Sequence, residues 1–352
     1  MDSFRSGYFQ TLSYPTPTTI LITDALYGPH IITEAALLSL LCSPHLLRLA
    51  SVDQHGVTGI LGLLPGITRL EHSIGAFLLV RLHGGSIAEQ AAALLHDISH
   101  TVFSHVIDWA LSKPEEESFH EVHKDRYVRG MTDLPALLEE HGLDPDEILR
   151  EELFPLVEQP APHLCADRLD YALRDAVALD KFSMQDVRVL LGALRAVPDA
   201  SAPQRILALS DAEVALRFAR AYIAVDAAVW SNRAHADMYR RLAGVIGNVI
   251  RGGLIEEEAL WRLSDREFWD EMKTVASEED RGVLDGLEKG GIPDEEGLPL
   301  PAGTKIRTID PDVVVDGDAQ VRSLSSVVTQ WAVEREEYVR ERERLRVREG
   351  EE

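Results

Sequence analysis

The chain has 352 residues, 45% of them hydrophobic, which is enough for one large buried core or for a core with an appended lobe. Its formal net charge of −24 repels polyanions, and the sequence shows no basic face of the kind that a general nucleic-acid binder needs. Two cysteines, Cys42 and Cys165, cannot form a disulfide framework, and no signal peptide or membrane-spanning run is evident. We therefore expect a cytoplasmic protein, with a nuclear location as the alternative.

The first predicted element is a β-hairpin over residues 18–33. Two β-branched runs flank a turn at Tyr27-Gly28, an arrangement that is typical of paired antiparallel strands. Most of the following chain has apolar residues three and four positions apart, which predicts amphipathic helices. The predicted helical segments are 34–51, 67–84, 86–100, 119–131, 163–180, 184–197 and 211–250.

The C-terminal part combines strand-like and charged segments. Residues 204–209 ("QRILAL") and 304–315 ("TKIRTIDPDVVV") are predicted strands of a small accessory sheet, and 333–352 is predicted as a charged, solvated or partner-facing helix. The fold class is therefore mainly α. We predict a hairpin segment at 1–29, a catalytic core at 30–196, a helical lobe that completes the active site at 197–275, an acidic loop or linker at 276–303, and an accessory strand with the charged helix at 304–352.

Four side chains on apolar helical segments are candidate metal ligands. His72 lies within "RLEHSIGAFLL", His96 and Asp97 end the next segment, and Asp167 lies within "CADRLDYALRDA". A carboxylate on such a face must be paired or bind a metal, because desolvating a lone charge is costly. Each residue alone is more often a hydrogen-bonded core histidine or an arginine-paired aspartate. Together they favour a metal site, and imidazole with carboxylate suits Fe, Mn, Zn, Ni or Co.

The ordered set His72, His96-Asp97 and Asp167 resembles the HD-domain metal-dependent phosphohydrolases. The segments "TRLEHSIGAFLL", "LLHDISHTVFSHVID" and "DRLDYALRDA" are similar to the deoxynucleoside triphosphate triphosphohydrolase branch of that family, and the likeness covers about residues 18–250. The resemblance implies an HD-domain helical fold with a short N-terminal β-hairpin and a small accessory β element near the C-terminus. It also implies that these four residues hold one divalent metal ion (Fe, Mn, Zn, Ni, Co or Mg).

The same resemblance implies catalytic roles for further residues of "HDISHTVFSHVID" and beyond. His105 with Asp108 would act as a proton donor or stabilise the phosphate, while His100 and His120 would position water and phosphate. Histidine suits this chemistry because its pKa lies near neutral pH and a carboxylate partner fixes its tautomer.

The resemblance also implies a substrate-binding set: Arg69 and Arg168 for phosphate, Tyr171 and Asp175 for the sugar, and Gln54 for its 3′-hydroxyl. The sequence departs from the branch at several positions. Arg168 replaces a lysine, and His55 replaces an apolar residue that helps to exclude a 2′-hydroxyl, so selectivity between deoxy and ribo sugars stays open. The spacing of Arg233 and Tyr239 does not reproduce the branch's phosphate-binding arginine and base-stacking tyrosine. Cys42, Leu47 and Ala50 stand where a mammalian member contacts its GTP activator and do not suit guanine, so we expect no GTP-activated tetramer.

The leading prediction is an enzyme that hydrolyses a (deoxy)nucleoside triphosphate to nucleoside plus triphosphate. One alternative is another HD-type phosphomonoesterase or phosphodiesterase, or a di-iron oxygenase in which His120 and His123 bind a second iron. Another is a metal-bound nucleotide sensor without catalysis. The expected partner is a nucleotide or other phosphorylated small molecule, and a homodimer is the expected assembly.

Overall fold

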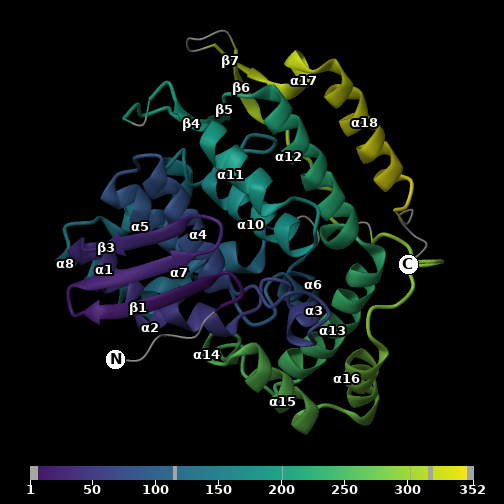
Figure 1. Ribbon diagram of the computed structural model, residues 1–352. Coiled ribbons are helices and arrows are strands. Elements are labelled where there is room, and N and C mark those ends of the chain that lie inside the picture. Colours follow the sequence, from purple (N-terminus) through teal and green to yellow (C-terminus); the bar gives the residue numbers. More distant parts are fainter. Residues whose placement is uncertain (1–6, 114–116, 200, 302, 316–319, 347–352) are drawn as a thin grey trace.

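The computed structural model describes residues 7–113, 117–199, 201–301, 303–315 and 320–346, and it confirms the mainly α fold (Figure 1). A three-stranded sheet lies near the N-terminus, and a second sheet has four strands contributed by the middle and the C-terminal part of the chain. The first half of the chain forms β1 (Gln10–Thr16), β2 (Thr19–Asp24), β3 (Gly28–Ile32), α1 (Ala35–Leu41), α2 (Pro44–Leu47), η1 (Arg48–Ser51), α3 (Val57–Ile60), α4 (Arg69–Leu82), α5 (Ile87–Leu95), α6 (Val106–Leu111), α7 (Phe119–Met131), α8 (Leu134–Glu140), α9 (Pro145–Ile148), η2 (Glu151–Leu153) and α10 (Ala166–Ala178). The second half forms α11 (Met184–Ala193), β4 (Leu194–Val197), β5 (Ile206–Leu209), α12 (Ala212–Val225), η3 (Asp226–Trp230), α13 (Arg233–Arg251), α14 (Ala259–Arg262), α15 (Asp265–Val275), α16 (Glu278–Gly290), β6 (Asp312–Val315), β7 (Gln320–Ser323), α17 (Leu324–Val327) and α18 (Thr329–Glu343).

The N-terminal sheet is an antiparallel meander in the order β1-β2-β3. The predicted hairpin is confirmed as β2 and β3, and Gly28 at its turn has a φ of +83°, which favours glycine. The sequence did not predict β1, because Pro15 and Pro17 interrupt its pattern. The structure accommodates Pro15 where the pairing of β1 with β2 shifts register between Ser13 and Thr16.

Three helices form the centre of the molecule: α4 packs against both α5 and α10. A capping box starts α4, because the Thr68 hydroxyl accepts the Glu71 N–H at 3.2 Å and the Glu71 carboxylate accepts the Thr68 N–H at 3.2 Å. All residues of α4 from Arg69 to Val80 are buried. Within the described ranges, however, no helix is both long enough and apolar enough to cross a membrane.

Helices α4 and α10 approach each other closely at Gly75. A Cβ atom at this position would collide with the side chains of Asp170 and Arg174 on α10. The Arg174 guanidinium is fully buried there between two carboxylates, 2.9 Å from Asp170 and 2.9 Å from Asp24 on β2. Gly75 therefore leaves room for an ion-pair network that joins α10 to the N-terminal sheet.

Several helical predictions extended too far. The helix predicted over 34–51 is divided into α1, α2 and η1, and the one predicted over 86–100 ends at Leu95. The helix predicted over 184–197 ends at Ala193, and Leu194–Val197 instead form β4, which pairs with β5. A short apolar run fits either a strand or a helix by periodicity alone. The continuous helix predicted over 211–250 is interrupted by η3, and the Asn232 side chain caps α13 by accepting two backbone N–H groups of its first turn.

The prediction of an acidic loop over 276–303 was wrong for its first half, which contains α16. Ser277 caps this helix by accepting the Asp280 N–H at 3.1 Å. Leu284 and Leu287 are buried where α16 packs against α13. Three apolar residues among many acidic ones gave too weak a periodic signal to predict a helix.

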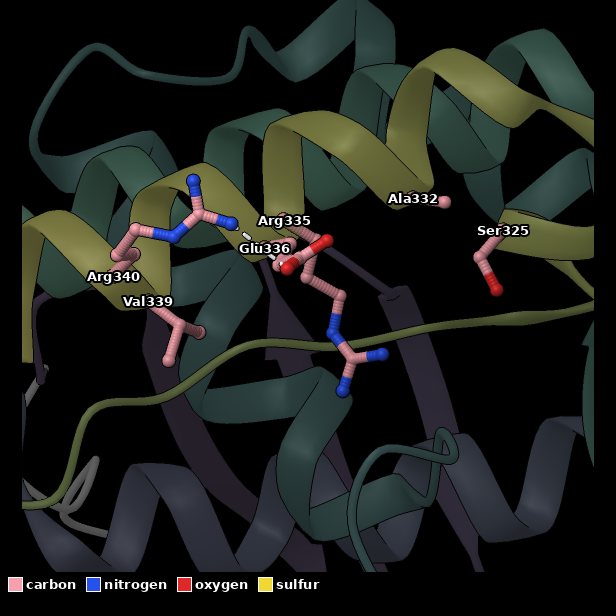
Figure 2. A pocket seen from close by; sticks show the side chains of 6 residues that line it. All are labelled: Ser325, Ala332, Arg335, Glu336, Val339 and Arg340. Atoms are coloured by element: carbon pink, nitrogen blue, oxygen red, sulfur yellow. Dashed lines mark hydrogen bonds and ion pairs between the residues drawn. The ribbon is translucent and has the colours of Figure 1, made fainter.

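The C-terminal chain completes the accessory sheet and ends in the predicted charged helix. β5 pairs with β6 in parallel and β6 pairs with β7 antiparallel, and α18 then runs along one edge of the molecule, drawn in yellow (Figure 1). A surface groove beside α18 contains none of the predicted site residues; it is lined by Ser325, Ala332, Arg335, Glu336, Val339 and Arg340 (Figure 2). The part of the predicted helix beyond residue 346 lies outside the described residues.

We predict that Gly75→Ala lowers the free energy of unfolding by about 1–3 kcal/mol, because the added methyl group overpacks the contact with α10. The matched control is Gly244→Ala on α13, where nothing lies within 4 Å of an added Cβ. That change should raise stability by about 0.5–1 kcal/mol, since alanine is the better helix former. Urea unfolding of both variants checks the pair, and equal effects would contradict the close approach at Gly75.

Candidate metal centre and active site

Three helical elements bring the four predicted metal ligands together. His72 lies in α4, His96 caps the C-terminal end of α5, Asp97 follows it, and Asp167 lies in the first turn of α10. The Nε2 atoms of His72 and His96 are 3.1 Å apart, and Asp167 Oδ1 lies 2.9 Å from the first and 3.5 Å from the second. The Asp97 carboxylate has one oxygen 3.7 Å from His72 Nε2 and the other 3.8 Å from His96 Nε2.

This donor set fits one divalent metal ion. Ligand atoms that share a metal at about 2.1 Å, at near right angles, lie about 3 Å from one another, close to the separations in this cluster. Burial would raise the pKa of Asp97, but the charges of His100 and Arg69 hold it well below its usual value. Burial acts in the same direction on Asp167, yet hydrogen bonds from the two histidine ligands lower its pKa. Both carboxylates are therefore kept ionised, as ligands must be.

Each histidine ligand is oriented through its other ring nitrogen. His72 Nδ1 lies 2.8 Å from Asp170 Oδ2, and His96 Nδ1 lies 2.8 Å from the carbonyl oxygen of Ala93. Donation from Nδ1 means that, once a metal replaces the Nε2 protons shared with Asp167, each Nε2 would offer its electron pair to the cluster. The Tyr27 hydroxyl donates to the other oxygen of Asp170 at 2.7 Å. The buried network of Arg174 thus ends directly on the predicted metal ligand His72.

The turn that follows the ligand pair has a strained backbone. Phe103 and Ser104 have φ values of +57° and +50°, a left-handed region that costs non-glycine residues on the order of 1–3 kcal/mol each. The Asp265 carboxylate stabilises the turn by accepting the Phe103 N–H at 2.8 Å, and the Phe103 ring is fully buried. This turn leaves the rings of His100 and His105 edge to face, 5.2 Å apart.

The structure brings the three predicted catalytic histidines together next to Asp97. His100 stacks on His120 with ring centroids 3.7 Å apart, and the His105 ring lies 5.7 Å from that of His120. His100 Nε2 is 3.3 Å from Asp97 Oδ1, whereas His105 Nδ1 is 2.9 Å from Asp108 Oδ2. The His100 side chain is buried, while 41% of the His105 side chain is exposed. His105 is therefore the member of the cluster that a substrate can reach most directly.

The two predicted phosphate-binding arginines differ in their surroundings. Arg69 donates to Asp97 Oδ2 at 2.6 Å and to the Ser104 hydroxyl at 3.0 Å, so its guanidinium lies beside the metal cluster. Arg168 instead donates to two backbone carbonyls of the loop before α10, at 2.6 and 3.0 Å, and lies 3.3 Å from the Glu158 carboxylate. The structure therefore places Arg69 beside the predicted metal ligand Asp97 and Arg168 in a loop-stabilising set of contacts.

Tyr171 and Gln54 are two of the residues expected to bind the sugar, and they differ in their hydrogen bonding. The Tyr171 ring is 6.2 Å from the ring of His72, and its hydroxyl is 2.7 Å from the Tyr222 hydroxyl. The side-chain oxygen of Gln54 is buried, and within the described part of the chain it has no hydrogen-bond partner. An unpartnered buried acceptor is costly and is a feature expected of a ligand-binding position.

Asp175, the third predicted sugar ligand, is held by two neighbours. One of its oxygens lies 3.0 Å from His55 Nε2 and the other accepts the Trp230 indole N–H at 2.8 Å. Burial opposes a charge on His55, but the neighbouring Asp175 acts to raise its pKa. Tyr239 lies next to this pair and donates its hydroxyl to the His55 carbonyl at 2.8 Å. His55 is a departure from the related branch, and it lies against the Asp175 carboxylate that was expected to bind the sugar.

Two residues weighed as alternatives lie outside these clusters. The His123 ring packs against Phe119 at 4.2 Å and Trp261 at 6.1 Å, and among the described residues it belongs to no group with metal-ligand spacing. Arg233 donates to the carbonyl oxygen of Leu298 at 2.9 Å. The proposed second iron site of an oxygenase would therefore lack His123.

Comparison with known proteins identifies the family. The HD-domain family model matches residues 69–175, the segment that carries all four predicted ligands. The metal-dependent phosphohydrolase cns2 of Cordyceps militaris is 51% identical over 334 residues, covering 95% of this chain and 96% of the relative. The chain belongs to the HD-domain metal-dependent phosphohydrolases. A divalent metal is thus its cofactor, as the donor set indicates.

More distant relatives show how widely the likeness extends. The uncharacterized protein YdhJ of Bacillus subtilis is 32% identical over 84% of this chain and 89% of its own length. The human deoxynucleoside triphosphate triphosphohydrolase SAMHD1 is 29% identical over 41% of this chain and 26% of its own length. The crystal structure of a hypothetical protein from Aquifex aeolicus has the same fold, with a TM-score of 0.65 at 17% identity over 89% of this chain and 93% of that one.

Several residues that build the site were not predicted from the sequence. Asp170 orients His72, Asp265 holds the strained turn, and Trp230 binds Asp175. Asp170 could have been found, because it lies three residues after Asp167 and four before Arg174, on neighbouring positions of one helix. Asp265 and Trp230 act across long sequence separations and have no local signal.

We predict that Asp170→Asn weakens metal affinity about 10–100-fold, because the outer partner of a metal-bound histidine fixes its tautomer and orientation. Competition of the purified variant with a fluorescent chelator measures this. Tyr27→Phe removes only one hydrogen bond to Asp170 and should have a smaller effect, and the exposed Asp125→Asn should have none. Unchanged metal affinity in a folded Asp170→Asn variant would contradict the assignment.

Proposed function

We propose that the protein hydrolyses a phosphoester bond of a nucleotide, with (deoxy)nucleoside triphosphate converted to nucleoside plus triphosphate as the leading reaction. The observation that carries the proposal is the cluster formed by the four ligands with His100, His105, His120 and Arg69. The similarity of the core to a human deoxynucleoside triphosphate triphosphohydrolase supports the choice of substrate. A homodimer and a cytoplasmic or nuclear location remain predictions.

The residues around the cluster have different proposed roles in phosphoester hydrolysis. A divalent metal held by His72, His96, Asp97 and Asp167 supplies Lewis-acid polarisation of a phosphoryl oxygen and a lowered pKa for water. Arg69 is fixed in position by Asp97 and Ser104 and adds positive charge for the phosphate. The stacked rings of His100 and His120 border the same space and position water and phosphate oxygens.

His105 is the proposed proton donor to the leaving nucleoside oxygen. Asp108 accepts from its Nδ1, and the other Asp108 oxygen accepts the Phe119 N–H at 2.7 Å, so the imidazole has a fixed orientation. Partial burial lowers the pKa of His105, and the neighbouring Asp108 carboxylate acts to raise it. The negative charge of a bound phosphate adds to that of Asp108, and we expect it to keep the imidazole protonated in the complex.

Sugar and base contacts are proposed on the side of Tyr171. Its ring contacts His72, and the unpartnered Gln54 oxygen provides an acceptor for a sugar hydroxyl. His55 and Trp230 already contact the Asp175 carboxylate. A sugar hydroxyl must therefore compete with them for Asp175 or be bound by His55 instead. This arrangement favours different sugar selectivity from that of the related branch, and ribonucleotides belong in the substrate panel.

A second candidate is a nucleotide phosphomonoesterase of the same HD type. The observation in its favour is that Arg168, which was expected to bind phosphate, contacts Glu158 and two loop carbonyls instead, and that Arg233 contacts the 295–298 segment. A site with fewer available arginines suits a substrate with fewer phosphates.

Incubation of the metal-depleted and Mn²⁺-loaded protein with NTPs, dNTPs and nucleoside monophosphates tests the proposal. We expect triphosphate release from at least one triphosphate, only in the metal-loaded sample, with chelation abolishing it. Release of inorganic phosphate from monophosphates alone would instead establish the second candidate. No product from any nucleotide would contradict both.

For the acid role, we predict that His105→Gln lowers kcat about 10²–10³-fold with little change in KM, because the leaving oxygen loses its proton donor. Asp108→Asn should lower kcat by about tenfold through misorientation of the same imidazole. His141→Gln is the matched control, since His141 only contacts the Ser39 hydroxyl at 2.9 Å outside the site. Steady-state kinetics check the series, and a His105→Gln variant within threefold of the parent kcat would exclude the acid role.

A further inference from the structure

The C-terminal helix α18 is attached by side-chain hydrogen bonds to the short π-helix η3. The Tyr338 hydroxyl donates to Asp226 Oδ2 at 2.6 Å, and the Ser231 hydroxyl donates to the same oxygen at 2.8 Å. Arg342, one turn after Tyr338 on α18, donates to both the hydroxyl and the carbonyl oxygen of Ser231. Asp226 is the first residue of η3 and Ser231 follows its last. Two side chains of α18 therefore bind both ends of η3.

The Asp226 carboxylate depends on these donors, because Asp226 and Ser231 are both fully buried. Burial raises the pKa of Asp226, while the hydrogen bonds from Tyr338 and Ser231 and the positive charge of Arg307 act to lower it. A buried polar group that loses a partner is costly, since water cannot replace the lost hydrogen bond. Removing the Tyr338 hydroxyl should therefore loosen η3 as well as delete one contact.

Trp230, the last residue of η3, connects this attachment to the predicted sugar ligands. Its indole N–H donates to Asp175 Oδ2 at 2.8 Å, and its ring meets Tyr171 edge to face at 5.1 Å. The Tyr171 ring in turn lies 6.2 Å from the ring of the predicted metal ligand His72. The Arg307 guanidinium carbon lies over the same indole, 6.0 Å from its centroid. Direct contacts thus lead from η3 to the edge of the metal cluster.

The residues that follow η3 approach Asp175 from a second direction. Asn232, next to Ser231, caps α13 by accepting the N–H groups of its first turn. Tyr239 on α13 donates its hydroxyl to the His55 carbonyl at 2.8 Å, and His55 Nε2 lies 3.0 Å from Asp175 Oδ1. Both oxygens of Asp175 therefore face residues whose position depends on η3 and the start of α13.

We propose that Tyr338 and Arg342 are positioning residues that set the affinity for the nucleoside part of the substrate by holding Trp230 against Asp175. The inference rests on the proposed function, which assigns Asp175 and Tyr171 to the sugar. Within the described residues, neither side chain of α18 contacts a predicted metal ligand, so substrate affinity rather than turnover should respond. The helix lies outside residues 69–175, the segment matched by the HD-domain family model.

Solvent exchange of the indole N–H protons, followed by NMR of isotope-labelled protein, tests the positioning without turnover. The Trp230 signal is identified by its absence from Trp230→Phe. We expect Tyr338→Phe to accelerate exchange at Trp230 about tenfold, because the hydrogen bond to Asp175 is less well held. Trp261 and Trp269 are internal controls, since their indole N–H groups donate at 2.8 Å to partners outside η3. Equal acceleration at all three tryptophans, or none at Trp230, would overturn the positioning role.

Kinetics of the Mn²⁺-loaded protein with the nucleotide that it hydrolyses fastest measure the effect on the substrate. We expect Tyr338→Phe to raise KM about three- to tenfold and to leave kcat within about threefold. Trp230→Phe should raise KM at least as much, since it removes the donor to Asp175. The double variant should have the KM of Trp230→Phe alone, because Tyr338 acts through the indole.

Further variants separate positioning from a general loss of stability. Arg342→Gln should raise KM as Tyr338→Phe does, and it carries the same test if Tyr338→Phe does not fold. Arg340→Gln is its matched control, because Arg340 is an exposed residue of the same helix that donates to Glu336. Tyr8→Phe is the control for Tyr338→Phe, since Tyr8 is exposed. Both controls should keep the parental KM.

The possible outcomes separate the two proposals. If nucleotides are hydrolysed but the KM effects of Tyr338→Phe and Trp230→Phe multiply in the double variant, the positioning role is overturned and the proposed function stands. A folded Tyr338→Phe variant with the parental KM also overturns it. If no nucleotide is hydrolysed, the proposed function fails, and the exchange of the Trp230 indole proton alone decides the positioning role.

Discussion

The fully buried Arg174 guanidinium is the interaction on which the rest of the site depends. It lies between Asp24 of the N-terminal sheet and Asp170 of α10, and Asp170 in turn orients the metal ligand His72. Removing one partner of such a buried pair costs about 3–5 kcal/mol, because a charge is left without compensation. The same contacts that attach the sheet to the helices therefore also set the direction of a predicted metal ligand.

A second constraint acts on the other side of the metal cluster. The ligand pair His96-Asp97 is followed by the left-handed turn at Phe103-Ser104, which the buried carboxylate of Asp265 stabilises. The predicted ligands His72 and Asp167 thus lie in helices and His96 and Asp97 lie at the end of one, while His105 follows a strained turn. Rigid helices suit a fixed coordination geometry. An exposed histidine beside them can contact the substrate as its atoms move during the reaction.

The sequence predicted the chemistry of the centre better than its surroundings. The four ligand types stand out because charged and imidazole side chains are rare on apolar helical faces. The structure groups His72, His96 and Asp97 at metal-ligand spacing and brings Asp167 to 2.9 and 3.5 Å from the two histidine Nε2 atoms. The strand β1 and the helix α16 were missed because prolines or acidic residues obscured their periodicity. The family resemblance matched Arg168 to a phosphate-binding position, but only the structure shows that it contacts Glu158 and loop carbonyls. Contacts between distant segments, such as Arg307 with Trp230, leave no local pattern to find.

Anomalous diffraction from crystals of the Mn²⁺-loaded protein tests the central claim most directly. The described geometry predicts one manganese peak per chain, at about 2.1–2.2 Å from Nε2 of His72 and His96 and from the carboxylates of Asp97 and Asp167. The structure also contains a neighbouring group with metal-ligand spacing, Asp97 with His100 and His120. A peak at that group instead, or two peaks sharing Asp97, would contradict a single-metal centre in which these histidines serve the substrate.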